Sequence, residues 1–588
     1  VHEYRGVFGS HVSLVFRRLA RVAARFESDP QYVACSATIG NPVEHASAVT
    51  GRPASSFALV DDDASHRGPK RWLFWNPPLH HGGTGRRRSN HVETQRIVAD
   101  LVQRDLQTLV FARARQTAER YAQKSAGTLR DRGETGLANR IAAYQAALEP
   151  ERRRELEAGI DAGRIRGIWS TNALELGVDI GTLDAVVLDG YPGTRMNTFQ
   201  QAGRAGRGDD ESLVVLVAGE DQLDQYVMAH PEALFDGDPE RAVVNPENEQ
   251  LLDDHLACAA RETWLEPDDE TVFGETLPER VSRLTETGIL SRRTTDDGLK
   301  WVFDGDGSPQ HEMSLRTIDD QEIQLLVQGD TIATLPRSDA LRDAHPGAIY
   351  HHQGRTYEVT DLDLDRGIAT LSPTWADYYT NVLTDKDIRV EADLDEREPF
   401  PREDVPVRLA DITLTTTVTG YERNDGKSGE TLSRHTLSLP SQTLHTKAMY
   451  LTIPEPLEWQ LRTMGDFEGG IHAAEHAMIS MLPTTVLCDR RDVGGLSTPL
   501  HPHTGKSTIF VYDGYPGGVG LVRAGFEDVY DLVRETLSML QSCPCEDGCP
   551  ACVQSPQCGN ANESLDKAIA IPLLESVLGD EVLGDSAL

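Results

Sequence analysis

The chain has 588 residues, enough for roughly three to five domains, and a net charge of −36 from 57 basic and 93 acidic side chains. It contains no run of 18 apolar residues, and its start lacks the pattern of a secretory leader. These features argue against a membrane protein, and we expect a cytoplasmic one.

Acidic residues are spread along the whole chain, and only eight of the 57 basic residues are lysines. Dispersed acidity with scarce lysine is typical of a halophile, whose molar cytosolic salt screens the repulsion between like charges. We therefore expect a halophile's protein, with an ordinary acidic protein as the alternative. In molar salt, counterion release adds little to nucleic-acid binding.

Residues 1–57 have the pattern of the end of an α/β domain. The segment QYVACSATIG reads as an apolar strand that ends at Ser36-Ala37-Thr38, before the helix breakers Gly40 and Pro42. The SAT triplet carries weight because it stands about 130 residues before a second motif and after the segment VHEYRGVFGSHV.

Residues 58–240 alternate strand and helix, the pattern of a doubly wound parallel sheet. The expected strands are RWLFW, QTLVFA, RGIWST, AVVLDG and LVVLVAG. Arg113 follows the second of these strands at the start of a helix, where it could contact a nucleic-acid phosphate. The alternative for Arg113 is a solvated arginine.

Two further patterns lie within residues 170–207. The first is Thr171-Asn172 followed by Gly177 and Asp179. The second is QxxGRxGR, and its members are Gln200, Gly203, Arg204, Gly206 and Arg207. Together they resemble motifs V and VI of superfamily 2 helicases, while SAT resembles motif III and TLVFARARQ resembles motif IV.

The resemblance implies an ATP-driven motor with Mg²⁺. Arg204 and Arg207, with Gln200, would be catalytic, because arginine stays charged and binds phosphate bidentately. Being three residues apart, the two arginines would share one face of a helix. Gly177, Asp179 and Gly203 would line the ATP site.

The same resemblance assigns the remaining motor residues. Thr171, Asn172 and Arg113 would bind nucleic acid. Ser36, Thr38 and His2 would couple the ATP site to it. VHEYRG resembles the end of a DEVH-type motif II and the residues after it, with Val1 and His2 as the last two letters of the motif.

No segment fits the phosphate-binding pattern GxxxxGK[ST]. The TGKST at 504–508 has Leu500 where the first glycine is needed and Pro502 inside the loop, so we expect a turn there. We therefore expect an N-terminally truncated motor, or half of a split one.

The remainder of the chain divides into three expected regions. Residues 241–305 read as helical and winged-helix-like, with a wing near 299–303 that could bind duplex DNA. Residues 306–400 alternate apolar and polar side chains, as in a small β domain. Residues 401–588, after the linker PFPREDVP, mix strands and helices in an α+β domain.

Five of the eight cysteines fall within the segment CPCEDGCPACVQSPQC. Zinc prefers four tetrahedral thiolates in a structural site, and the Pro and Gly residues between the cysteines let a short loop wrap one ion. We expect Zn²⁺ bound by Cys543, Cys545, Cys549 and Cys552. In the competing set Cys558 replaces Cys543, and an iron–sulfur cluster is the alternative metal.

His472, Glu475 and His476 have the HxxEH spacing, which puts both histidines on one helical face. A metal hydrolase would use this spacing with a third, acidic ligand downstream. We expect instead a packed or hydrogen-bonded helix face.

The C-terminal segment from GFEDVYDLV to CGNANESLDK resembles the zinc-binding domain of the mitomycin repair factor A family. This family implies RecA-like domains, the first one partial here, and 3′ to 5′ unwinding of single-stranded or forked DNA in repair. A separate N-terminal motor half or a repair nuclease would be a partner. The alternative functions are a non-catalytic DNA-binding subunit of a split helicase and, less favoured, a zinc hydrolase.

Overall fold

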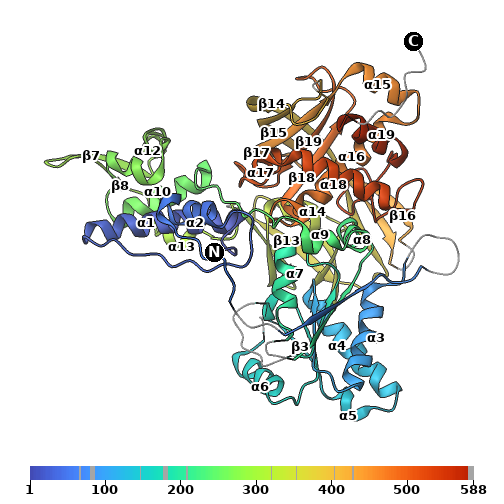
Figure 1. Ribbon diagram of the computed structural model, residues 1–588. Helices are drawn as coiled ribbons and strands as arrows, with labels where there is room; N and C mark the ends of the chain where they lie inside the picture. The colour runs from blue at the N-terminus through green and yellow to red at the C-terminus, as the bar shows by residue number, and fades with distance from the viewer. Residues whose placement is uncertain are drawn as a thin grey trace. The chain divides into compact units, whose positions relative to one another are not determined.

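The protein is described from a computed structural model covering residues 1–64, 68–79, 87–145, 148–175, 183–206, 210–318, 321–352, 354–402, 404–426 and 429–579 (Figure 1). It forms two compact units. Unit 1 consists of Val1–Leu59, Arg241–Val533 and Ser555–Leu588. Unit 2 consists of Val60–Glu240 and Arg534–Gln554.

Unit 2 is built on a parallel sheet with the strand order β1-β6-β5-β2-β4-β3. The strands are β1 (Lys70–Trp75), β2 (Thr108–Ala112), β3 (Ile141–Tyr144), β4 (Gly167–Ser170), β5 (Ala185–Asp189) and β6 (Ser212–Val217). Parallel neighbours need crossover connections, which helices provide in such a sheet. The predicted α/β class with a doubly wound parallel sheet is confirmed.

Helices alternate with these strands. They are α3 (Asn90–Gln103), α4 (Arg115–Asp131), α5 (Thr135–Ala138), α6 (Pro150–Asp161), α7 (Arg195–Ala202), α8 (Gln222–Ala229) and α9 (Glu232–Asp236). The expected strands and helices of this region are found, and β3 is an addition. Its four residues are too few to stand out in the sequence.

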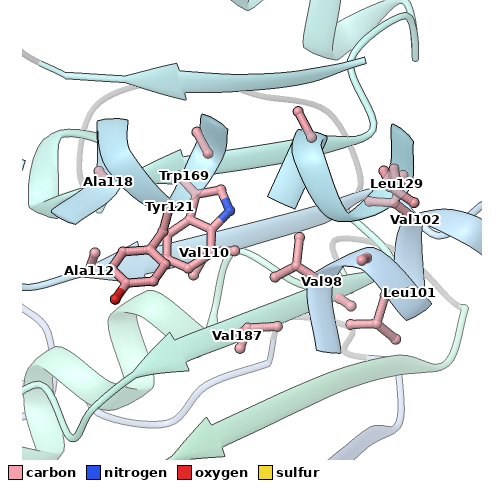
Figure 2. Close-up of a cluster of buried hydrophobic side chains, with 14 of the residues drawn as sticks. Val98, Leu101, Val102, Val110, Ala112, Ala118, Tyr121, Leu129, Trp169 and Val187 are labelled. Carbon is pink, nitrogen blue, oxygen red and sulfur yellow. The ribbon is translucent and has the colours of Figure 1, made fainter. Parts of the chain in front are cut away.

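The core of unit 2 lies between α3, α4 and the sheet (Figure 2). Trp169 of β4 is fully buried, stacks on Tyr121 of α4 at 5.8 Å between ring centroids, and donates from Nε1 to Ser125 Oγ at 3.2 Å. A buried indole N–H needs such a partner. Val98 and Val102 of α3 belong to the same buried cluster.

The second segment of unit 2, Arg534–Gln554, is attached to α8 and the residues after it. Gln222 Nε2 donates to the carbonyl of Gln554 at 2.7 Å, and Ser538 Oγ lies 3.2 Å from His230 Nε2. The cysteine-rich segment therefore belongs structurally to a unit whose sheet ends more than three hundred residues earlier.

The N-terminal part of unit 1 is helical. Helix α1 (Gly6–Arg25) is followed by α2 (Pro42–Thr50) and packs on α10 (Glu249–Glu262). Leu14 of α1 joins the core formed by α10, α11 (Glu270–Phe273) and α12 (Leu277–Glu286). Strands β7 (Leu290–Thr295) and β8 (Gly298–Phe303) then form a two-stranded antiparallel wing, and α13 (Pro309–Glu312) follows.

The strand expected within residues 31–38 is not present. The described residues 1–59 contain helices and turns, so no partner strand lies in that segment, and Val33 is 87% exposed. A single strand without a neighbour cannot form the ladder that stabilises it, so an apolar run alone is insufficient.

Two further sheets complete unit 1. The small one has the order β10-β9-β13-β12-β11. Its strands are β9 (Glu322–Val327), β10 (Asp330–Pro336), β11 (Ile349–His352), β12 (Arg355–Asp363) and β13 (Ile368–Pro373), with α14 (Arg337–Asp343) between β10 and β11.

The C-terminal sheet has the order β14-β15-β17-β19-β18, with β16 paired to β15. Its strands are β14 (Tyr378–Arg397), β15 (Val407–Asp425), β16 (Thr431–Thr436), β17 (Gln442–Ile453), β18 (Val493–Thr498) and β19 (Ser507–Asp513). Strand β14 lies within the region 306–400, yet it pairs along β15. Alternation along a strand shows that it is a strand, but not which sheet it joins.

The C-terminal helices are α15 (Glu455–Arg462), α16 (Phe467–Met481), α17 (Leu521–Glu527), α18 (Val529–Ser542) and α19 (Lys567–Val577). Helix α16 is almost completely buried, and its Gly470 faces Ile569 of α19 so closely that a Cβ would collide with that side chain. The two helices pack at short range because this position has no side chain.

Candidate functional site

The QxxGRxGR pattern lies at the end of α7. The side chain of Thr194 caps this helix by accepting from the backbone N–H of Asn197 at 3.1 Å. The helix ends at Ala202, and Gly206 then adopts φ +69°. Arg204 therefore lies beyond the end of α7, so the expectation of a helix across Arg204 is not met. Arg207 itself lies outside the described residues.

Arg204 is buried and turned toward the first pattern. Only 8% of its surface is exposed, and its Nε donates to the backbone carbonyl of Glu175 at 2.9 Å. Gln201 Nε2 donates to the Glu175 carboxylate at 2.9 Å. Gln200 is half-buried, and Gly203 follows the helix. The two patterns therefore meet at Glu175.

The first pattern follows β4. Thr171 is buried, and Asn172 is exposed at the start of a short 3₁₀ turn, Asn172–Leu174. Gly177 and Asp179, which the resemblance places in the ATP site, lie outside the described residues. The roles of all these side chains stay predictions.

Arg113, directly after β2, forms hydrogen bonds and ion pairs within unit 2. Its Nη1 donates to Asp221 at 2.7 Å, its Nη2 to Asp224 at 2.5 Å and its Nε to the carbonyl of Tyr191 at 3.1 Å. Burial and the neighbouring Asp221 raise the pKa of Asp224 to about 8. Sequence reasoning missed this pairing because the two acids stand more than a hundred residues away. Phosphate binding by Arg113 stays a prediction.

His2 contacts the SAT triplet. The backbone N–H of Ala37 donates to His2 Nδ1 at 2.8 Å, and Ser36 Oγ lies 3.5 Å from the same nitrogen. His2 is buried, Ser36 is exposed and Thr38 is exposed. The segments that the resemblance assigned to one coupling role thus lie together, although helix α1 separates them in the chain.

The TGKST segment forms a turn, as predicted. The backbone N–H of Gly505 donates to the carbonyl of His501 at 2.8 Å, and β19 starts at Ser507. Among the residues that the structure describes, no helix has the length and apolar character needed to cross a bilayer.

Four cysteines converge in the segment after α18. The Sγ–Sγ distances are 3.6 Å for Cys543–Cys545, 3.5 Å for Cys543–Cys549, 3.4 Å for Cys545–Cys552 and 3.8 Å for Cys549–Cys552. Thiolates about 2.3 Å from a tetrahedral Zn²⁺ lie about 3.8 Å from one another. The four residues therefore fit a closed zinc site.

The backbone between the cysteines turns tightly. Gly548, with φ +99°, lets the chain turn before Cys549, whose carbonyl accepts from the N–H of Cys552 at 3.0 Å. Cys558 is grouped with His472 and His476 rather than with these four.

Three family models match parts of the chain. The helicase conserved C-terminal domain matches residues 93–209, and the winged helix domain of ATP-dependent helicase HRQ1 matches residues 244–318. The MrfA zinc-binding domain matches residues 474–553, which include the four clustered cysteines.

Relatives match over nearly the whole chain. The chain is 35% identical to the Bacillus subtilis uncharacterized ATP-dependent helicase YprA, over 94% of this chain and 72% of that protein. It is 29% identical to the Saccharomyces cerevisiae ATP-dependent helicase HRQ1, over 98% of this chain but only 55% of that protein. The crystal structure of DUF1998 helicase MrfA bound to DNA is similar, with a TM-score of 0.63 and 34% identity over 98% of this chain and 75% of that one.

Proposed function

Because the chain belongs to the superfamily 2 helicases of the MrfA family, with a C-terminal zinc-binding domain, we propose that it works as an ATP-dependent DNA helicase that moves 3′ to 5′ in DNA repair. The observation that supports this most is the long match to YprA together with the helicase C-terminal domain at 93–209. That domain contains both patterns that meet at Glu175.

The proposed chemistry is hydrolysis of ATP with Mg²⁺. Phosphoryl transfer depends on charge cancellation by positioned cations, and we assign this role to Arg204 and Arg207, with Gln200 beside them. Gly177, Asp179 and Gly203 would contact the nucleotide. The carbonyl of Glu175 holds the Arg204 guanidinium through Nε, which limits its rotation. The similarity to a structure of MrfA bound to DNA and AMPPNP supports a nucleotide site.

DNA is the proposed track, single-stranded or forked. We assign contacts to Thr171, Asn172 and Arg113, with Ser36, Thr38 and His2 as the coupling residues. Support comes from a MrfA structure bound to DNA. The competing proposal is a non-catalytic DNA-binding subunit of a split helicase.

We assign structural Zn²⁺ to Cys543, Cys545, Cys549 and Cys552. The matching zinc-binding domain and the Sγ distances support this. When bound, zinc would crosslink the segment after α18 by four metal–sulfur bonds. The high acidity further supports a working environment of molar salt.

The first test measures ATP turnover with and without forked DNA. The 588-residue chain alone should not hydrolyse ATP. A preparation that also contains a phosphate-binding loop, joined to the chain or added separately, should hydrolyse ATP and unwind forks with a 3′ tail. Within that preparation, Arg204→Ala should lower kcat by about 10³-fold, as removal of other phosphate-facing arginines does.

The matched control is Arg71→Ala, since Arg71 is exposed and pairs with Glu211 at the surface. This variant should unwind normally. Unchanged kcat in Arg204→Ala would contradict the assigned role. Tight DNA binding without any turnover, in every preparation, would favour the non-catalytic subunit.

A further inference from the structure

A second group of metal-ligating side chains lies in unit 1. His472 and His476 stand one turn apart on α16, and their ring centroids are 4.4 Å apart. Cys558 Sγ lies 3.6 Å from His472 Nε2, and one ligand atom from each of the three residues lies within 4.8 Å of the others. The three residues come from a buried helix and from the loop before α19.

The separation of these atoms fits a bound metal. Nitrogen and sulfur ligands about 2.1 and 2.3 Å from a tetrahedral zinc ion lie about 3.6 Å apart. The observed distance between Cys558 Sγ and His472 Nε2 is 3.6 Å. An ordinary thiol–imidazole hydrogen bond reaches the same distance, and the orientation of the histidine ring separates the two cases.

The orientation of the His472 ring is that of a metal ligand. Its other ring nitrogen, Nδ1, lies 3.3 Å from the backbone carbonyl of Ser564. Histidines that bind metals almost always donate their second N–H to a carbonyl or carboxylate, which fixes the ring and its tautomer. In this arrangement Nε2 is left to face Cys558 with its lone pair.

The loop that carries Cys558 is held in place on both sides. Asn562 accepts from the N–H of Ser555 at 2.7 Å and donates to its carbonyl at 2.9 Å. The carbonyl of Gly559 accepts from the N–H of Thr384 at 3.1 Å. A preorganised loop of this kind keeps a third ligand near two helical histidines.

The ligand chemistry is also suitable. The thiolate is the form of cysteine that binds metal. Two imidazoles and a thiolate are ligands that suit zinc.

We propose that His472, His476 and Cys558 form a second zinc site, separate from the four-cysteine cluster, with three protein ligands and one open position. The three side chains line a cavity of about 1890 Å³ in unit 1, together with Glu475. Three-ligand zinc sites keep their fourth position for water or another small ligand. Glu475 is held there by a hydrogen bond from Ser497 Oγ at 2.9 Å. The proposal does not depend on the helicase assignment.

Metal content of the purified 588-residue chain provides the test. Elemental analysis after gel filtration should give two zinc ions per wild-type chain and one in Cys558→Ser and in His472→Asn. The control Cys35→Ser should keep two, because Cys35 is exposed and belongs to neither group. One zinc ion in the wild type, unchanged in Cys558→Ser, would overturn the proposal and leave a hydrogen-bonded cluster.

Cobalt substitution tests the ligand set directly. The variant Cys545→Ser/Cys549→Ser should still bind one Co²⁺ with a thiolate-to-cobalt charge-transfer band, and added azide should shift its visible bands because the fourth position is open. If this variant does not fold, the difference between wild-type and Cys558→Ser cobalt spectra gives the same readout. No Cys558-dependent band, or no response to azide, would contradict the site as stated.

Discussion

At Gly206 the backbone leaves α7 with φ +69°, and a Cβ would lie 2.9 Å from Ser212 Cβ. Gly206→Ala should therefore lower the free energy of unfolding for two reasons, the left-handed conformation and the overlap. The conformation alone costs roughly 1–2 kcal/mol. Urea unfolding followed by circular dichroism measures the loss.

The matched control for Gly206 is Gly163→Ala. Gly163 has φ +64° with no atom within 4 Å of its hypothetical Cβ, so it carries only the conformational cost. We expect the loss at Gly206 to exceed that at Gly163 by about 1 kcal/mol or more. Equal losses would show that the contact with Ser212 relaxes freely.

A second prediction at this scale concerns His45, which is almost completely buried. Burial lowers its pKa from 6.5 to about 4. Between these values the unfolded chain binds a proton that the folded chain does not, so stability falls as pH decreases from 6.5 to 4. His45→Gln should remove up to about 3 kcal/mol of this acid-induced loss.

Unfolding by urea at about pH 7, 6, 5 and 4 checks this prediction for His45. The control is His503→Gln, whose side chain is 44% exposed. The control should keep the wild-type slope with pH. An unchanged slope in His45→Gln would show that its proton is not linked to folding.

For single residues, the sequence shows which side chains have the chemistry of a ligand, but it does not show which distant residues they contact. The clustered cysteines are recognisable because their ligand chemistry and spacing lie within one short segment. The contact of Cys558 with two histidines has no such signal, since His472 and His476 lie more than eighty residues away and meet it only through the packing of α16 and α19. Arg113 is a similar case, because Asp221 and Asp224 are distant in the chain.

At the scale of elements, one buried and one exposed ion pair connect α1 to the segment after α10. Arg21 donates from Nε to Asp269 at 2.6 Å with side chains 5% and 12% exposed. Arg25, one turn later, pairs with Glu266 at 2.9 Å with side chains 42% and 37% exposed. Arg21→Ala should lower the free energy of unfolding by about 3–5 kcal/mol, because it leaves a buried carboxylate unpaired.

Arg25→Ala is the internal control on the same helix. Exposed pairs contribute about 1 kcal/mol or less, so this variant should unfold close to wild type. Thermal unfolding of both variants, measured side by side, gives the comparison. A small effect at Arg21 would mean that water reaches Asp269 when the arginine is removed.

Elements are predictable where periodicity is long and local. The region 241–305, which the sequence predicts to be helical, contains α10, and the five expected strands of the parallel sheet are found. The prediction of a strand at 31–38 is wrong because strands need neighbours. The prediction of a helix across Arg204 is wrong because α7 ends at Ala202. The alternation of apolar and polar residues along β14 does not determine that it pairs with β15, because tertiary packing selects the neighbouring strand.

At the scale of the whole molecule, the net charge of −36 sets the response to salt. The Debye length falls from about 10 Å at 0.1 M to about 3 Å at 1 M, so like charges repel less. We expect the melting temperature to rise by several degrees between about 0.1 and 2 M KCl. Sucrose, which leaves ionic strength unchanged, is the control for general preferential exclusion, and no rise in KCl would contradict adaptation to salt.

The division of unit 2 into two separate stretches of chain has a consequence for synthesis on the ribosome. The sheet and its helices are complete at Glu240, but Gln222 and His230 meet their partners only when Gln554 and Ser538 have been translated. While residues 241–533 are being translated, Gln222 and His230 of unit 2 therefore lack these hydrogen-bond partners. The nascent chain therefore closes unit 2 late, after most of unit 1 has left the exit tunnel.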